Sequence, residues 1–448
     1  MKKILVSLFT LVTITISAQS DISKVLTEIA TAPSAERIEK DIRTLVNFGT
    51  RHTLSDTVSE IRGIGAARRW IKSEFDRISK ACNNCLEVSY QRNLVSKDNR
   101  RITKDTYVVN VLAVQRGTKY PNSYVIMSGD IDSRVSNVNN YTSDSPGAND
   151  NASGMAGTIE AARILSKYKF PVSIIYVGLS GEEQGLYGGQ YMAKIAKDEG
   201  WDIVGVINND MIGNIKGIDA VIDNSTFRVF SEAISMELSE KQKASMRFYG
   251  GEVDGPSRQL ARYIDKITDA YMTNLDAIMI YRLDRFGRGG HHRPFNDLGF
   301  AGVRIMETHE NYNQQHQDLR TENGIKYGDV IEAVNFDYAA KLTAVNALTL
   351  ASLASAPLAP KNVKIGGAVK PSTQLKWDGV EDSNLLGYKI YWRDTTSPQW
   401  QKSRFVGDVT EYTLENIVID NYLFGVASVG KNGAESLVQF PYQLIRQN

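Results

Sequence analysis

The alternation of short apolar runs with amphipathic segments most constrains the fold of this 448-residue chain. Three runs, SYVIMSG (123–129), VSIIYVGLSG (172–181) and DIVGVINND (202–210), are continuous and apolar, as is typical of strands buried on both faces. Between them, residues 153–168 and 188–200 have helical spacing. Strand–helix–strand alternation predicts an α/β fold, with a mixed, mostly parallel sheet flanked by helices.

The character of the sequence changes near residue 355. Residues 353–360 are rich in Pro, Ala and Ser and predict a linker. Residues 361–448 contain short alternating runs separated by turn residues, with no helical period, and predict a small all-β sandwich. We therefore expect a first domain over residues 19–352 and a second over residues 361–448.

Residues 1–18 have the layout of a secretory signal peptide. Two lysines precede an apolar stretch, residues 4–16, and small residues follow up to Ala18. A membrane anchor is the alternative, but the stretch is shorter than the ~20 residues that a span needs. The sequence predicts export to a periplasm or the extracellular space, with no membrane span in the mature chain.

The composition narrows the choice of partners and the role of the cysteines. A formal net charge of +1 gives no indication of a nucleic-acid partner. The only cysteines are Cys82 and Cys85. Such a pair is redox-active or half a zinc site in a reducing compartment, but a local disulfide is favoured in an exported protein.

Acidic side chains follow each of the three central strands. Asp130 and Asp132 end the first strand and point the same way, so their carboxylates raise each other's pKa and favour a cation beside them. Glu182 and Glu183 follow the second strand, and Asp210 ends the third. Ligand sites of open α/β sheets form at this carboxyl edge, so the pattern predicts a metal site.

Two further residues complete the candidate site. Asp150 lies in PGANDNASG (146–154), and His316 lies in a loop after the predicted strand AGVRIME (301–307). A hydrolytic metal site needs anionic ligands and one base that the metal does not occupy. Adjacent Glu182 and Glu183 suit these two tasks, because one can bind the ion while the other faces the bound water.

Six segments, in order and rough spacing, resemble the zinc peptidases of family M28. They are GDIDS, PGANDNASG, LSGEEQG, NNDMIG, HHRPF and QHQD. Over residues 35–350 the chain resembles the secreted bacterial leucyl aminopeptidases of that family, and residues 361–448 resemble a fibronectin type III domain.

The resemblance implies two divalent metal ions, both zinc unless another ion occupies the Asp130 site, and a role for each acid. The implied metal ligands are Asp130, Asp150, Glu183, Asp210 and His316. Asp150 would bridge the ions, with Glu183 and His316 completing one site and Asp130 and Asp210 the other. Glu182 would be the general base, and Asp132 an acid that supports the residue at position 130.

Asp130 stands where the family pattern has a histidine. It binds the ion directly in the favoured interpretation, since carboxylates are competent zinc ligands and could also favour another ion at that site. In a second interpretation that ion is weak or absent, which leaves a one-metal enzyme. In a third the chain is an inactive relative, but an intact Glu182 argues against this.

The resemblance implies a secreted, metal-dependent aminopeptidase that hydrolyses the first peptide bond of peptides with a free N-terminus. His292 and Tyr312 are candidates for the substrate pocket. The alternatives are a carboxypeptidase or a glutaminyl cyclase on the same scaffold, or an inactive binding relative. A carboxypeptidase needs a cation for the substrate carboxylate, for which Arg293 and Arg304 are candidates.

Overall fold

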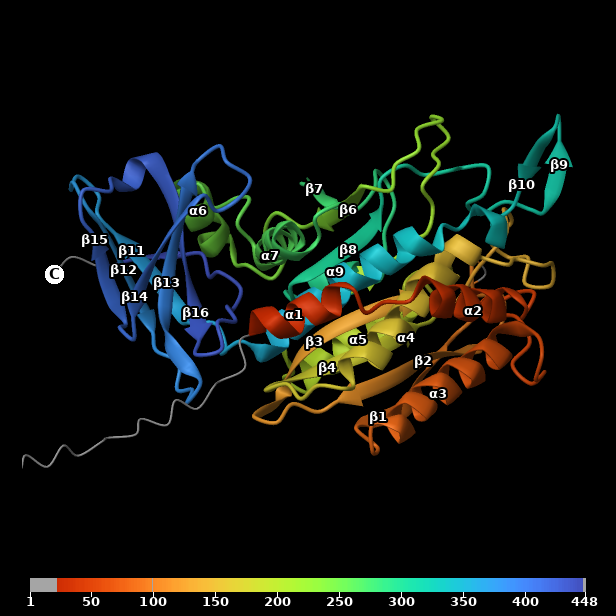
Figure 1. Cartoon of the computed structure of the whole chain (residues 1–448). Coiled ribbons are helices and arrows are strands. Elements are labelled where there is room, and N and C mark those ends of the chain that lie inside the picture. Colours follow the sequence, from red (N-terminus) through yellow and green to blue (C-terminus); the bar gives the residue numbers. More distant parts are fainter. Residues whose placement is uncertain (1–21, 99, 446–448) are drawn as a thin grey trace, which may run out of the picture.

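The computed structural model describes residues 22–98 and 100–445 and shows two packed domains (Figure 1). The predicted signal peptide, residues 1–18, lies outside the described residues. Among the helices described, none combines the length and the apolar character needed to cross a membrane.

A single eight-stranded sheet organises the first domain, with the order β1-β2-β4-β3-β5-β8-β6-β7. The strands are β1 (Leu86–Val95), β2 (Thr106–Gln115), β3 (Tyr120–Asp130), β4 (Val172–Leu179), β5 (Asp202–Asn209), β6 (Thr226–Ser231), β7 (Asp276–Ile280) and β8 (Gly302–Glu307). The central run β4-β3-β5-β8 is parallel throughout, and β6 is parallel to β7. The pairs β1–β2, β2–β4 and β6–β8 are antiparallel, so the expected mixed, mostly parallel sheet is confirmed.

Helices cover both faces of this sheet (Figure 1). They are α1 (Ile22–Ala30), α2 (Ala35–Val46), α3 (Gly63–Ala81), α4 (Gly154–Leu165), α5 (Tyr187–Asp198), α7 (Pro256–Tyr271), α8 (Arg293–Asp297) and α9 (Phe336–Ser355). A further helix, α6 (Glu240–Tyr249), lies beside the second domain instead (Figure 1). Side chains of α4 and α9 share one buried cluster with Val125 and Met127 of β3, while α5 and α8 share another with Tyr124 and Ile126. Successive residues of β3 therefore enter opposite layers, which explains its continuous apolar sequence.

Two local features bear on the sequence predictions. Cys82 and Cys85 form a disulfide with an S–S distance of 2.02 Å just after α3, as expected for this pair. Helix α9 continues to Ser355, so it extends three residues into the segment that the sequence predicts as a linker.

The second domain is a sandwich of two small sheets. Its strands are β11 (Lys361–Gly366), β12 (Thr373–Asp378), β13 (Leu385–Asp394), β14 (Lys402–Gly407), β15 (Glu411–Leu414), β16 (Tyr422–Gly430) and β17 (Gln443–Leu444). The sheet orders are β15-β12-β11-β17 and β14-β13-β16. Trp377 and Tyr388 pack between the sheets with ring centroids 5.3 Å apart, within a buried apolar core.

Ion pairs, one set of them fully buried, join the two domains. Asp254 of the first domain contacts Arg262 of α7 at 2.8 Å and Arg393 of β13 at 2.7 Å, and all three side chains are at most 1% exposed. Glu435 lies 2.6 Å from Lys266 of α7 and 2.8 Å from Lys389. The second domain is therefore docked on the first through specific contacts as well as through the connecting chain.

Candidate metal centre

The acidic segments meet at the carboxyl edge of the parallel strands. Strand β3 ends at Asp130, β5 is followed at once by Asp210, and the loop after β4 carries Glu182 and Glu183. Because β4, β3 and β5 are neighbours with the same direction, their following residues converge in space.

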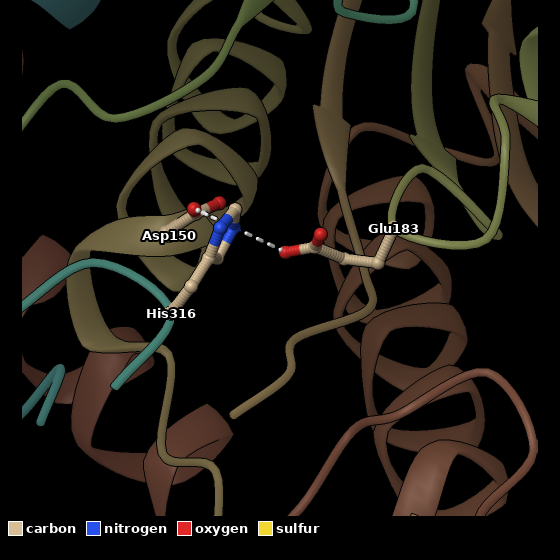
Figure 2. Close-up of side chains that lie close together, drawn as sticks. All are labelled: Asp150, Glu183 and His316. Atoms are coloured by element: carbon tan, nitrogen blue, oxygen red, sulfur yellow. Dashed lines mark ion pairs between the residues drawn. The ribbon is translucent and has the colours of Figure 1, made fainter. Parts of the chain in front are cut away.

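Three of the predicted ligands form a compact group, which we call the three-ligand group: Asp150, Glu183 and His316. His316 Nε2 lies 2.9 Å from Asp150 Oδ2 and 2.9 Å from Glu183 Oε1 (Figure 2). One ligand atom from each residue lies within 4.8 Å of the other two. One imidazole nitrogen and two carboxylates make a donor set that suits zinc and leaves a coordination position open for water or substrate.

The electrostatics of the three-ligand group favour a cation. Burial lowers the pKa of His316, but the charges of Glu183 and Asp150 outweigh it and raise that pKa to about 9. Burial raises the pKa of Asp150 and of Glu183, yet His316 holds both below their usual range. A positive charge is thus stabilised between these two carboxylates, and metal binding would displace a proton from the imidazole.

Backbone geometry aims Asp150 into this group. Gly147 has a φ of +53°, and a Cβ atom there would meet the Asp150 carbonyl oxygen at 2.5 Å. The Asp329 carboxylate accepts hydrogen bonds from the backbone N–H groups of Asn149 and Asp150 at 2.8 and 2.6 Å. A tight turn at Gly147 thus precedes Asp150, and Asp329 supports it, a role that had not been predicted.

Arg134 fixes the other two members of the group. Its Nε donates to Glu183 Oε2 at 2.7 Å, and its Nη2 lies 2.6 Å from His316 Nδ1. One guanidinium therefore contacts both the carboxylate from the loop after β4 and the imidazole from the distant 308–319 segment. No motif in the sequence indicated this role for Arg134.

Asp132 holds the turn that carries the two glutamates. Its Oδ1 accepts hydrogen bonds from the backbone N–H groups of Gly181 and Glu182 at 2.9 and 3.2 Å, and its Oδ2 accepts one from Glu183 at 3.0 Å. Thr53 Oγ1 also donates to Oδ2 at 3.1 Å. Asp132 therefore acts on the loop after β4, whereas the resemblance implied support of the residue at position 130.

Glu182 has the environment of a base. Burial, followed by the charges of Glu183 and Asp210, raises its pKa well above the usual range. Among the described residues no hydrogen-bond donor contacts its carboxylate, in contrast to Glu183. A carboxylate that is basic and free of partners is suited to accept a proton from water.

Asp130 and Asp210 lie at the same edge but contact other partners. Asp130 Oδ1 is 2.5 Å from His291 Nδ1, and its Oδ2 accepts a hydrogen bond of 2.8 Å from Asn151 Nδ2. Asp210 Oδ2 lies 2.9 Å from Arg304 Nη2. Burial raises the pKa of Asp130 to about 7 and that of Asp210 to about 8.

The remaining candidates lie in different surroundings. His292 is fully buried, with Nε2 2.7 Å from the Leu283 carbonyl oxygen, so the structure places it inside the protein and away from an open pocket wall. Tyr312 is 55% exposed in the loop before His316. Arg304 is completely buried in ion pairs and is not free to bind a substrate carboxylate, and the Arg293 Nε lies 3.8 Å from Asp297.

The fold and the three-ligand group together define a class: α/β proteins with a carboxylate–histidine metal centre at the carboxyl edge of the sheet. Residues 110–335 match the family model described as Peptidase family M28. The chain belongs to this family, as the resemblance indicated, and is accordingly a peptidase of a zinc-dependent kind.

Relatives in sequence and in structure agree with this assignment. A probable zinc metalloprotease of Leptosphaeria maculans is 43% identical over 410 residues, covering 91% of this chain and 95% of the relative. A probable zinc metalloprotease of Pyrenophora tritici-repentis is 38% identical over 426 residues, covering 94% and 97%. The LapA aminopeptidase of Legionella pneumophila shares the fold with a TM-score of 0.54 at 17% identity, over 75% of this chain and 76% of that one.

Proposed function

We propose that the chain is an exported zinc-dependent aminopeptidase that removes residues from peptides with a free N-terminus. The observation that carries this proposal is the three-ligand group beside Glu182, a base on the turn held by Asp132. Zinc bound to the group would polarise the substrate carbonyl and acidify a water molecule. Glu182 would take the proton from that water and pass it to the leaving amine.

An unpartnered oxygen supports recognition of the substrate amine. Asp210 Oδ1 is buried and has no hydrogen-bond partner among residues 22–98 and 100–445. An α-ammonium group would supply both the charge and the donor that this atom lacks. Arg304 does not offer a matching site for a substrate carboxylate, because it is already paired with Asp210 and Asp284.

The domain organisation belongs to the same proposal. Residues 1–18 direct export, residues 19–352 form the peptidase domain, residues 353–360 connect the domains, and residues 361–448 form a fibronectin type III-like domain. The two-sheet strand order of the second domain supports this assignment.

Mass spectrometry of a defined peptide pool tests the proposal. The pool holds each peptide with a free and with an acetylated N-terminus, and the purified protein is added with or without chelator. We expect loss of single residues from free N-termini only, and none with chelator. Trimming from the C-terminal end, or cleavage that chelator does not affect, would contradict the proposal.

A further inference from the structure

A buried guanidinium occupies the neighbourhood of the second expected ion. Arg304 of β8 is fully buried, and its Nη2 lies 2.9 Å from Asp210 Oδ2. Its Nη1 lies 3.0 and 3.1 Å from the two carboxylate oxygens of Asp284. One fixed cation thus bridges Asp210 to a second buried acid that the resemblance did not include.

This cation is a permanent part of the site. A guanidinium stays protonated in folded proteins, and Arg304 is paired with the two buried carboxylates of Asp210 and Asp284. Two buried carboxylates around one guanidinium would be strongly destabilised if the arginine were removed without replacement. Arg304 therefore neutralises charge that a metal ion would otherwise have to neutralise.

Asp130 is engaged as well. Its Oδ1 lies 2.5 Å from Nδ1 of the fully buried His291 and 3.5 Å from Asn208 Nδ2, while Asn151 Nδ2 donates to its Oδ2 at 2.8 Å. Both oxygens of this carboxylate therefore have protein partners. The family pattern has a histidine at position 130. In this chain a histidine side chain also lies there, but it belongs to His291 and contacts the Asp130 carboxylate.

The ligand geometry separates the two expected ion sites. Asp150, Glu183 and His316 bring their ligand atoms together, whereas within the described part of the chain neither Asp130 nor Asp210 belongs to any such group of three. A divalent ion held by Asp210 would also lie close to the Arg304 guanidinium and be repelled by it.

We propose that the chain binds one metal ion, at the three-ligand group, and that the Arg304 guanidinium is the fixed cation where the family pattern has a second ion. This inference rests on the proposed function for the identity of the first site. The arrangement leaves Asp210 Oδ1 for the substrate amine, since Arg304 occupies only Oδ2.

Counting metal ions tests this without an assay of activity. The full chain is saturated with zinc and desalted, and its zinc content is measured by elemental mass spectrometry and by intact mass under native conditions. We expect one ion per chain, unchanged in Asp210→Asn. Two ions in the native sequence, falling to one in Asp210→Asn, would overturn the proposal.

An arginine variant tests the role of Arg304 directly. Arg304→Met leaves Asp210 and Asp284 without a cation, so zinc content should rise from one ion towards two. Arg262→Met is the matched control, because it removes a buried arginine from the Asp254 ion pair at the domain interface and should leave the content at one. One ion in a folded Arg304→Met variant would contradict the assigned role.

The outcomes also separate this inference from the proposed function. Two zinc ions together with chelator-sensitive aminopeptidase activity would contradict the single-ion inference but support the proposed function. A protein that binds no zinc and shows no turnover would contradict both the single-ion inference and the proposed function.

Discussion

The carboxylate of Asp132 accepts a hydrogen bond of 3.0 Å from the backbone N–H of Glu183. The same carboxylate accepts bonds from the two preceding N–H groups, so it holds the whole 181–183 turn. The proposed metal ligand Glu183 and the proposed base Glu182 are thus positioned together by one acid just after the neighbouring strand β3. A change at Asp132 should therefore affect both binding and catalysis.

Asp132→Asn should lower kcat/KM and zinc affinity together, each by about 10- to 100-fold. The amide NH2 group would face backbone N–H donors, so at least one of the three bonds would be lost and the turn would loosen. Steady-state kinetics and zinc titration measure the two effects. Asp105→Asn is the control, because this exposed carboxylate also accepts a backbone hydrogen bond, from Lys97, but away from the site. Equal effects of the two variants would contradict the role of Asp132.

The adjacent glutamates should separate into two phenotypes. Glu182→Gln keeps the size of the side chain but removes the base, so kcat should fall by about 100- to 10,000-fold while zinc content is retained. Glu183→Gln removes a charged ligand between Arg134 and His316, so zinc content itself should fall. Parallel measurement of kcat and zinc content checks this. Loss of zinc in Glu182→Gln would contradict these roles and indicate that Glu182 is the metal ligand and Glu183 the base.

Zinc should stabilise the folded chain through the three-ligand group. A ligand that binds only the folded state adds about 3 kcal/mol to the free energy of unfolding at about 100 times its Kd. The melting temperature of metal-free protein should therefore rise on zinc addition. His316→Ala removes the only nitrogen ligand of the group, so its melting temperature should respond far less. A full response in this variant would place the stabilising ion elsewhere.

The contact between the domains should weaken in acid. Burial raises the pKa of Glu435, but Lys266 and Lys389 outweigh it and lower that pKa below its usual value of 4.5. A lowered pKa in the folded state means that the stabilisation is fully present above pH 4.5 and is lost as pH falls further. Glu435→Gln should therefore cost about 1–2 kcal/mol near neutral pH and progressively less below pH 4.5.

Thermal unfolding of Glu435→Gln across pH measures this dependence. Glu411→Gln is the control, because Glu411 and Lys376 form an exposed pair on the same domain, 57% and 56% accessible. Such a pair contributes about 0–1 kcal/mol. A cost at Glu435 that is the same at pH 3 and pH 7 would show that the ion pairs do not stabilise the docking.

The order of elements and the acidic edge were predictable because their signals are local. Each buried strand is a short continuous apolar run, and the acid that follows it, such as Asp130 after β3 or Asp210 after β5, must lie at the carboxyl edge once the strands are parallel. The periodicity of apolar residues and the positions of strand ends depend on residues close together in the sequence, so both can be predicted from the sequence alone.

The partners of those acids were set by contacts between distant segments. Asp130 meets His291 across 161 residues, and Arg304 reaches the segment of Asp210 across 94. The sequence GGHHR offers two histidines, and only the packing of their loop turns His291 towards Asp130 and His292 towards Leu283. In the sequence, nothing distinguishes Arg304 from other arginines in strands. In the folded chain it is buried and pairs with Asp210 and Asp284, since an unpaired charge in the interior is too costly.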